Sequence, residues 1–397
     1  MSLVRDRLQR RQSDRLNMLR AGAALVVVIN HVRGLFFVHG SEVESPNIIF
    51  RAFYLVTSLG HQAVMVFFVL SGYLVGSSIV RSGMKDWSWR HYLNRRLTRL
   101  WIVLIPALVL CALIDHIGFS AFGLHGIYGT GRNTNGILPG PVPAQSTGGI
   151  FFGNIFFLQG IHVPTFGANG ALWSLTYEFW YYLLFPLVML TVYARPPFAK
   201  ATAGLAALGI ILFVGSTISL YFLVWLLGVA VYVAPPIRLL SSRSAWQVCM
   251  AASLGACALW LAVADAAGWL TVANSTGVRP SDFVTGILFA CVIYLVVQSP
   301  RRAGDDQGTR VGRVASHLAA FSFTLYLVHL PVLVFVRADL QDHGTALWQP
   351  TVAHLIIAAA MVIAVVFAAF AVSLVTEAQT DRLRMWVSRT IREPGAN

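Results

Sequence analysis

Three titratable residues lie deep inside long apolar stretches of this chain, where they could carry out chemistry together. At a rise of about 1.5 Å per helical residue, His31, Glu178 and His329 all fall about 10 Å below one boundary of a membrane core about 30 Å thick. A charged side chain at that depth costs about 2.5–3.5 kcal/mol, so each is a candidate functional residue. The types fit a His–carboxylate pair, in which Glu178 orients an imidazole that takes a proton from an attacking group.

Other interpretations of this layer stay open at this point. A proton relay through a transporter uses the same residue types, and a single intramembrane His is often a structural residue hydrogen-bonded between helices. A structural or partner-binding subunit is a further alternative, although it leaves the cost of burying these groups unexplained. His61 falls at a similar depth, but its register is less constrained.

Arginines on two stretches add a second feature. Arg20 precedes His31 by eleven residues, which amounts to three helical turns plus 20°, so both side chains share one face. Alone, Arg20 would be a snorkelling interface residue; aligned with His31, it indicates one wall of a polar passage. Arg96 and Arg99 are neighbours on a helix face and match the geometry of phosphate, although anchoring by positive charge on the inner side is the plainer interpretation.

The segment Ser71-Gly72-Tyr73 closes an apolar stretch at the same inner level as these arginines. It would either let a ligand approach the backbone closely or form a packing notch of small residues.

The elements that position these residues must be membrane-spanning helices. Of the 397 residues, 57% are apolar and only 11% are charged, and the mean hydropathy is +0.68. An ordinary soluble domain carries about 25% charged residues, which excludes that class. We therefore expect an all-α integral membrane protein with about ten transmembrane helices and a polar passage between them. The segments long enough to span are 18–38, 52–80, 100–117, 171–194, 199–216, 217–234, 246–266, 281–299, 315–338 and 349–376.

The basic residues predict the orientation of these spans. With ten spans and a cytoplasmic N-terminus, 24 of the 29 Lys and Arg residues fall on the inner side, so both termini are expected in the cytoplasm. This placement accounts for the net charge of +13 and argues against a nucleic-acid partner. The expected division is a basic N-terminal segment attracted to membrane lipid, a transmembrane domain with a long outer loop and a re-entrant or interfacial piece, and a basic tail. The expected boundaries are 1–17 for the N-terminal segment, 18–376 for the transmembrane domain and 377–397 for the tail. Within the transmembrane domain, the outer loop covers 118–148 and the re-entrant or interfacial piece covers 149–162.

Five motifs along nearly the whole chain resemble those of acyltransferase family 3, bacterial membrane proteins that acylate extracytoplasmic glycans and some secondary metabolites. They are an Arg-x10-His pair at Arg20 and His31, the run from Val66 to Leu74, an Arg-x-x-Arg pair at Arg96 and Arg99, the Trp-Ser-Leu-x-x-Glu element at 173–178, and the run from Phe321 to Pro331. Two positions depart from the family pattern: Tyr73 stands where phenylalanine is common, and His61-Gln62-Ala63 replaces a more usual small or acidic stretch. These departures put the acceptor preference in doubt.

The resemblance implies transfer of an acyl group, with acetyl favoured, from cytoplasmic acetyl-CoA to a hydroxyl of a glycan or lipid-linked sugar at the bacterial inner membrane. The implied catalytic residues are His31, Glu178 and Arg20; those at the cofactor are Arg96, Arg99, Ser71 and Tyr73; and those at the substrate or oxyanion are His329, Trp173 and Tyr326. The alternative is a proton-coupled exporter of a sugar or acylated metabolite. No metal is expected, because no His or carboxylate spacing on one helix resembles a metal-ligand motif.

Overall fold

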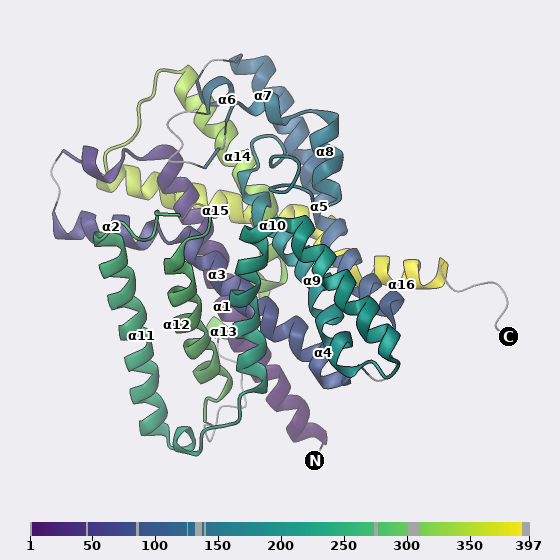
Figure 1. Ribbon diagram of the computed structural model, residues 1–397. Coiled ribbons are helices and arrows are strands. Elements are labelled where there is room, and N and C mark those ends of the chain that lie inside the picture. The colour runs from purple at the N-terminus through teal and green to yellow at the C-terminus, as the bar shows by residue number, and fades with distance from the viewer. Residues whose placement is uncertain are drawn as a thin grey trace. The chain divides into compact units, whose positions relative to one another are not determined.

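The computed structural model is predominantly helical in the part that it describes (Figure 1). That part comprises residues 2–44, 47–84, 87–124, 126–131, 137–138, 140–273, 277–300 and 310–390, with the side chains of 2–12, 310–311 and 390 outside the description. The helices are α1 (Ser2–Phe36), η1 (Gly40–Glu42), α2 (Ile48–Thr57), α3 (Gly60–Ser71), η2 (Gly72–Gly76), α4 (Ser77–Ser82), α5 (Trp89–Phe122), α6 (Gly126–Thr130), α7 (Val142–Gln145), α8 (Gly148–Ile155), η3 (Gly170–Leu172), α9 (Trp173–Tyr193), α10 (Pro197–Val233), η4 (Arg238–Ser241), α11 (Arg243–Ala266), α12 (Pro280–Val297), α13 (Arg310–Ala320), α14 (Ser322–Asp342), α15 (Val352–Val375), η5 (Glu377–Gln379) and α16 (Thr380–Thr390).

The expected all-α integral membrane fold is confirmed. Among the described residues, nine helices or helical runs are long and apolar enough to cross a membrane. The difference from the ten expected spans lies in α10, which covers both 199–216 and 217–234. Gly215 interrupts this helix with φ 79° and ψ 176°, and the hydroxyl of Ser219 donates to the carbonyl of Ile211 across the break. Each arm of α10 is about 27 Å long at about 1.5 Å per residue, which is close to a membrane core.

The chain divides into two compact units, each built from three chain segments. Unit 1 contains Met1–Ala23, His61–Asp86 and Tyr177–Ala319, and unit 2 contains Ala24–Gly60, Trp87–Thr176 and Ala320–Asn397. Of the three intramembrane residues singled out above, His31 and His329 belong to unit 2 and Glu178 belongs to unit 1.

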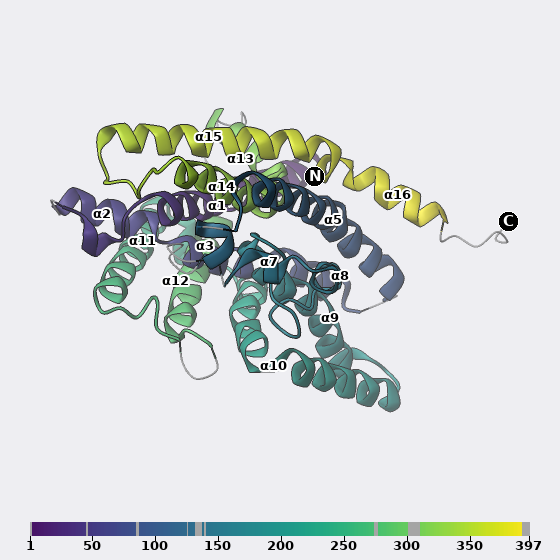
Figure 2. The same cartoon turned by 90° about the horizontal axis from the view of Figure 1, so that it is seen from above.

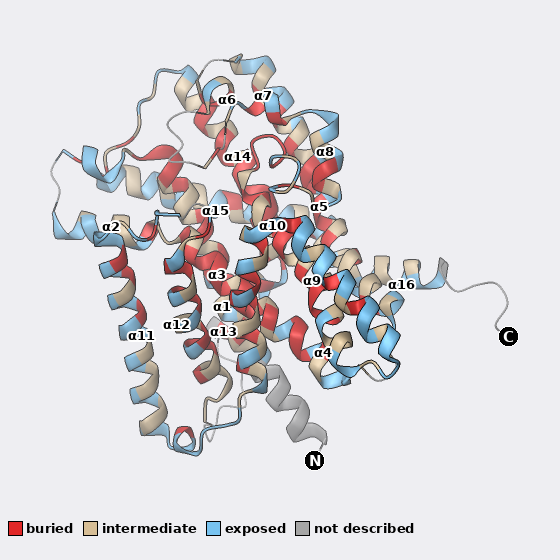
Figure 3. Ribbon diagram, viewed as in Figure 1, coloured by how far each residue is buried: buried red, intermediate tan, exposed pale blue. Residues whose placement is uncertain are grey.

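Unit 2 is organised around α14. Both α5 and α15 pack against this helix (Figure 2). More than half of α14 is buried, whereas α15 buries only Val365, Ala369 and Ser373, and none of the described side chains of α16 is buried (Figure 3). Since a helix that is apolar all round and buried belongs to the interior of its unit, α14 is the helix best placed to hold a site in water-poor surroundings.

A proline in α14 leaves one backbone carbonyl without its helical hydrogen bond, and a side chain distant in the sequence donates to that carbonyl. Pro331 has no backbone N–H, so the carbonyl of Leu327 loses its helical hydrogen bond. The side-chain amide of Asn169 donates to this carbonyl at 2.7 Å, and Asn169 is fully buried. The loop before α9 is thereby attached to α14 two residues from His329.

Buried side chains also satisfy the irregular backbone between α8 and η3. The amide group of Asn154 donates to the carbonyls of Ile150 and Pro164 and accepts from the N–H of Phe166. Asp115 accepts from the N–H of Ala168 at 2.9 Å. Irregular backbone at membrane depth is tolerated where protein surrounds it, and residues 165–169 of this segment are buried.

Two short helices occupy part of the predicted outer loop, 118–148, and α5 extends five residues into it. The placement of this loop on the outer side stays a prediction. Within 149–162, α8 has only eight residues, or about 12 Å, which is too short to span. Its re-entrant or interfacial placement stays a prediction.

In unit 1, Gly72 of the segment Ser71-Gly72-Tyr73 lies in a packing notch of small residues between two helices. Helix α3 widens into the π-helical turn η2 at this point. A Cβ at Gly72 would overlap the carbonyl oxygen of Trp225 on α10, and a Cβ at Gly228 would overlap the carbonyl oxygen of Val69. The glycines let the backbones of η2 and α10 approach closely, as small residues do between membrane helices.

We predict that Asn169→Ala lowers the free energy of unfolding by about 1–2 kcal/mol, because it leaves the Leu327 carbonyl without a donor. Denaturation of the purified protein in detergent would measure this cost. Pro331→Ala restores an N–H to the same carbonyl, so the double variant should lose less than the sum of the single variants. Additive losses would contradict the assignment of Asn169 to this carbonyl.

Candidate functional site

Two histidines of unit 2 form a direct pair. His31 on α1 and His329 on α14 approach with Nδ1 of His31 2.7 Å from Nε2 of His329. Their rings stack at 4.9 Å between centroids and 19° between planes. His329 is fully buried and its Nδ1 lies 2.9 Å from the carbonyl oxygen of Leu325, whereas His31 is partly exposed. The structure thus joins two of the three residues that were predicted at one depth.

Tyr326 lies next to this pair within unit 2. Its ring centroid is 6.1 Å from that of His329, and its hydroxyl is 2.8 Å from the hydroxyl of Ser174. Ser174 follows Trp173 at the start of α9, directly after the buried loop that Asn169 attaches to α14. The predicted acceptor-side residues Trp173, Tyr326 and His329 therefore all belong to one unit.

Glu178 has its own hydrogen-bond network in unit 1. Its Oε1 accepts from the hydroxyls of Ser71, at 3.2 Å, and Tyr182. The indole N–H of Trp225 donates to the Ser71 hydroxyl at 3.2 Å. The network joins the end of α3 to α9 and α10, and it places the carboxylate among donors rather than beside a cation.

The predicted pairing of His31 with Glu178 stays a prediction. Within their own units, His31 pairs with His329, and Glu178 pairs with Ser71 and Tyr182. The two predicted partners belong to different units, so this pair is not part of either network. Ser71 was predicted to contact the cofactor, which stays a prediction; in this structure its hydroxyl donates to Glu178 and accepts from the indole N–H of Trp225.

The predicted phosphate-binding residues lie near the start of α5 in unit 2. The guanidinium of Arg96 lies over the ring of Tyr92, at 5.7 Å from the centroid. Arg99 is partly exposed, and no hydrogen bond or ion pair of its guanidinium is found with the described residues. These side chains have the charge and the fork geometry to hold a phosphate.

The remaining predicted residues lie in unit 1. Arg20 is partly buried on α1, and this helix is continuous through Arg20 and His31, as the spacing argument requires. Tyr73 packs edge-on against Tyr232, with centroids 6.0 Å apart, and Arg81 donates to the Tyr232 hydroxyl. The predicted roles of Arg20 in catalysis and of Tyr73 at the cofactor stay predictions.

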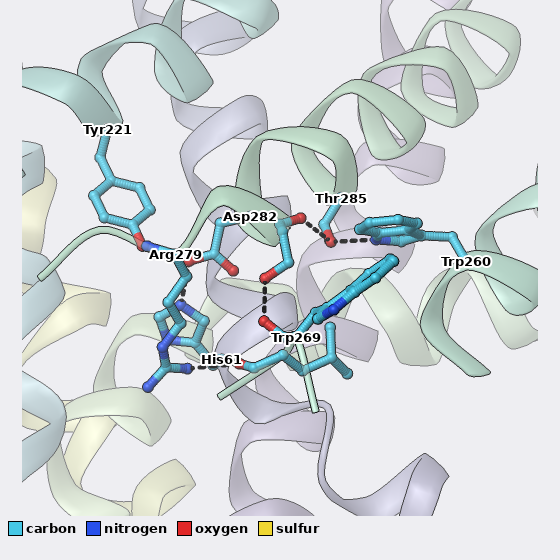
Figure 4. A network of polar contacts seen from close by, with 9 residues as sticks. His61, Tyr221, Trp260, Trp269, Arg279, Asp282 and Thr285 are labelled. Atoms are coloured by element: carbon cyan, nitrogen blue, oxygen red, sulfur yellow. Dashed lines mark hydrogen bonds and ion pairs between the residues drawn. The ribbon is translucent and has the colours of Figure 1, made fainter. Parts of the chain in front are cut away.

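A His–carboxylate pair does occur in unit 1, between residues that the sequence interpretation did not join (Figure 4). His61 Nε2 lies 2.7 Å from Oδ2 of Asp282, which also accepts from the hydroxyl of Tyr221. Asp282 is fully buried in the first turn of α12, where the helix dipole favours a negative charge. The sequence feature that could have indicated this pair is Asp282 itself, an acidic residue inside the apolar segment 281–299.

The same network braces α11 and the loop before α12. The indole N–H of Trp260 donates to Thr285, and the Ser281 hydroxyl donates to the carbonyl of Trp269. The backbone N–H of Arg279 donates to the Tyr221 hydroxyl. These contacts assign the His61–Asp282 pair a clear structural role. No group of three or more metal-ligating side chains is found in the described part of the chain.

We predict that Asp282→Ala lowers the free energy of unfolding by about 1–3 kcal/mol, because His61 and Tyr221 lose a buried acceptor. Asp282→Asn keeps an acceptor oxygen and should lose less. Asp265→Ala on α11 is the control: that residue is exposed, so its change should stay within about 0.5 kcal/mol. Equal thermal stability of the Asp282→Ala and Asp265→Ala proteins would refute the role of the network.

Comparison with known proteins identifies the family. The chain matches the acyltransferase domain family over residues 13–372, which is nearly its whole length. No curated protein and no solved structure matches the chain. The matched region contains both the histidine pair of unit 2 and the Glu178 network of unit 1. This chain belongs to acyltransferase family 3, and it is a multi-pass membrane acyltransferase.

Proposed function

We propose that this protein moves an acyl group, with acetyl favoured, from cytoplasmic acyl-CoA to a hydroxyl of an extracytoplasmic or lipid-linked sugar. The observation that carries the proposal is the histidine pair: a partly exposed imidazole held by a fully buried one, inside helices of an acyltransferase domain. His31 is the general base. Imidazole is the side chain most often used for this task near neutral pH.

The donor binds at the inner side in this proposal. Arg96 and Arg99 hold the phosphates of coenzyme A, and the pantetheine arm extends along the face of α1 that carries Arg20 toward His31. The positive-inside distribution of charge supports this orientation, in which the helices span a bacterial inner membrane and both termini lie in the cytoplasm. Ser71 and Tyr73 keep their proposed place beside the cofactor.

The reaction is a direct transfer. His31 takes the proton of the acceptor hydroxyl as its oxygen attacks the thioester carbonyl carbon. The tetrahedral intermediate then breaks its C–S bond, and the thiolate receives the proton from His31. The products are an ester and free coenzyme A thiol. A preorganised donor aimed at the developing oxyanion would supply the largest electrostatic contribution, and the side chains of unit 2 nearest to the pair supply candidates.

Glu178 is proposed to assist from unit 1. Its carboxylate is hydrogen-bonded to Ser71 and Tyr182, so a movement of these donors would change its availability to a base or a substrate. Its part in the reaction rests on the family resemblance, and the side chain that is hydrogen-bonded to His31 in this structure is His329. The acceptor enters from the outer side beneath the segment 118–148.

We predict that His31→Gln abolishes acceptor-dependent release of thiol from acetyl-CoA while leaving acetyl-CoA binding intact. General-base catalysis contributes about 10²–10⁴-fold, so the loss should be at least about 100-fold. The assay uses the full-length protein in lipid nanodiscs, a thiol-reactive dye and a panel of glycan and lipid-linked sugar acceptors. His354→Gln is the control, because this partly exposed histidine of α15 bonds the Gln349 carbonyl rather than His329.

Three other outcomes would each change the proposal. Acylation of His31 by acetyl-CoA alone would replace direct transfer by a two-step route. Unchanged thiol release in His31→Gln would remove His31 as the base. Acceptor-sugar transport without any thioester consumption would favour the proton-coupled exporter.

We predict that Arg99→Ala raises the KM for acetyl-CoA by about tenfold or more with a smaller effect on kcat, because a charge-assisted contact to phosphate is lost. Arg90→Ala is the matched control, since Arg90 is an exposed arginine on the same helix. Equal KM values for the two variants would show that Arg99 only anchors the helix to the inner surface.

A further inference from the structure

The hydrogen-bond partners of His329 determine where its protons lie. Nδ1 of His329 is 2.9 Å from the carbonyl oxygen of Leu325, and a carbonyl oxygen only accepts. Nδ1 therefore carries a hydrogen and donates it. In a neutral imidazole the other nitrogen is then a lone-pair acceptor, so Nε2 of His329 has to accept a hydrogen bond.

His31 supplies that hydrogen. Its Nδ1 lies 2.7 Å from Nε2 of His329, so this nitrogen must be the protonated one. In neutral His31 the hydrogen on Nδ1 leaves Nε2 with a free lone pair. The Leu325 carbonyl thus sets the tautomer of His329, and His329 sets the tautomer of His31.

Burial favours the neutral form of His329. Its side chain is fully buried, and its hydrogen-bond partners include the neutral backbone of Leu325 and Tyr326 and the His31 imidazole. A buried cation without a counter-charge costs several kcal/mol. The stacked arrangement of the rings, at 4.9 Å and 19°, also restricts rotation of either imidazole away from this bond.

We propose that His329 is a positioning residue that holds His31 as the tautomer whose Nε2 is free to take the acceptor proton. This inference rests on the proposed function of His31. When Nε2 takes the proton, His31 becomes an imidazolium, and its Nδ1–H donates a stronger, charge-assisted bond to His329. The thiolate removes the same proton from Nε2, which returns the pair to its starting state.

The same arrangement separates the roles of the acceptor-side residues. Neutral His329 has one N–H, which the Leu325 carbonyl takes, so it has none to offer an oxyanion. Tyr326, whose hydroxyl lies 2.8 Å from that of Ser174, and Trp173 each carry a donor group, an O–H and an indole N–H respectively, and stay the candidate donors. His329 therefore acts through His31 rather than on the reacting atoms.

Two substitutions by amide side chains test the two hydrogen bonds of His329 separately. In His329→Gln, Oε1 reaches the position of Nε2 and accepts from His31. In His329→Asn, the shorter side chain places its NH₂ at the position of Nδ1, which keeps the bond to Leu325 but leaves Nδ1–H of His31 without an acceptor. Thiol release should stay within a few-fold of the wild-type rate in the Gln variant and fall by about 10–100-fold in the Asn variant.

The tautomer is measured directly by ¹⁵N NMR of the full-length protein labelled at histidine, without substrate. His31 and His329 are assigned by the signals missing from His31→Gln and His329→Gln. We expect His31 to carry its hydrogen on Nδ1 in the wild type and in His329→Gln, and to shift toward Nε2–H in His329→Asn. This readout is independent of turnover and of the acceptor used.

A hydrogen on Nε2 of neutral wild-type His31 would overturn the inference, as would equal activity of the Asn and Gln variants. If the tautomers are as expected but His31→Gln keeps full thiol release, the positioning is real and the proposed base is wrong. The two hypotheses therefore fail separately.

Discussion

A polar group buried in a membrane-spanning helix has no water to bond, so its partner has to come from the protein. This requirement organises much of unit 2. Pro331 deprives the Leu327 carbonyl of its helical partner, and Asn169 supplies a replacement from a loop far away in the chain. The attachment of that loop places the start of α9, with Trp173 and Ser174, within the same unit as the histidine pair.

The same requirement controls the protonation of the site. The Leu325 carbonyl already accepts within α14 and has a second lone pair, which the side chain of His329 uses. That bond removes the choice of tautomer from one imidazole and, through the 2.7 Å contact, from the next. A backbone atom that cannot change its role is thus the fixed end of a chain of hydrogen bonds leading to His31.

Hydropathy and spacing predicted the features that depend on one helix at a time. Span length, depth and shared helix face follow from a fixed rise and twist per residue, so the all-α membrane fold and the common depth of His31 and His329 were readable. Partner choice was not, because depth does not say which helices are neighbours. His61 and Asp282 could have been joined only by knowing that α3, α10 and α12 meet in unit 1.

The break at Gly215 shows a second limit of pattern reading. An apolar run of this length predicts helix on both sides of the glycine, and the expected boundary between 216 and 217 falls next to the observed one. The backbone at Gly215 has a positive φ, which glycine adopts without the steric cost that a side chain imposes. Similarly, the sequence leaves Gly72 open as part of a ligand site or of a helix interface, and the structure shows that it packs closely against the backbone of Trp225.

A neutral orienting group suits His31 as the base that we propose, at the membrane depth expected for it. A carboxylate beside His31 would stabilise the imidazolium more strongly, but it would also be a buried charge whenever the imidazole was neutral, and burying an unpaired charge is costly. His329 avoids that cost, because both rings are uncharged between turnovers. The imidazolium formed during transfer is then held less firmly, which favours return of its proton to the departing thiolate. Compared with a carboxylate, His329 therefore gives a weaker base but a histidine pair that is uncharged at rest. This suits the proposed reaction, in which the base takes and returns the same proton.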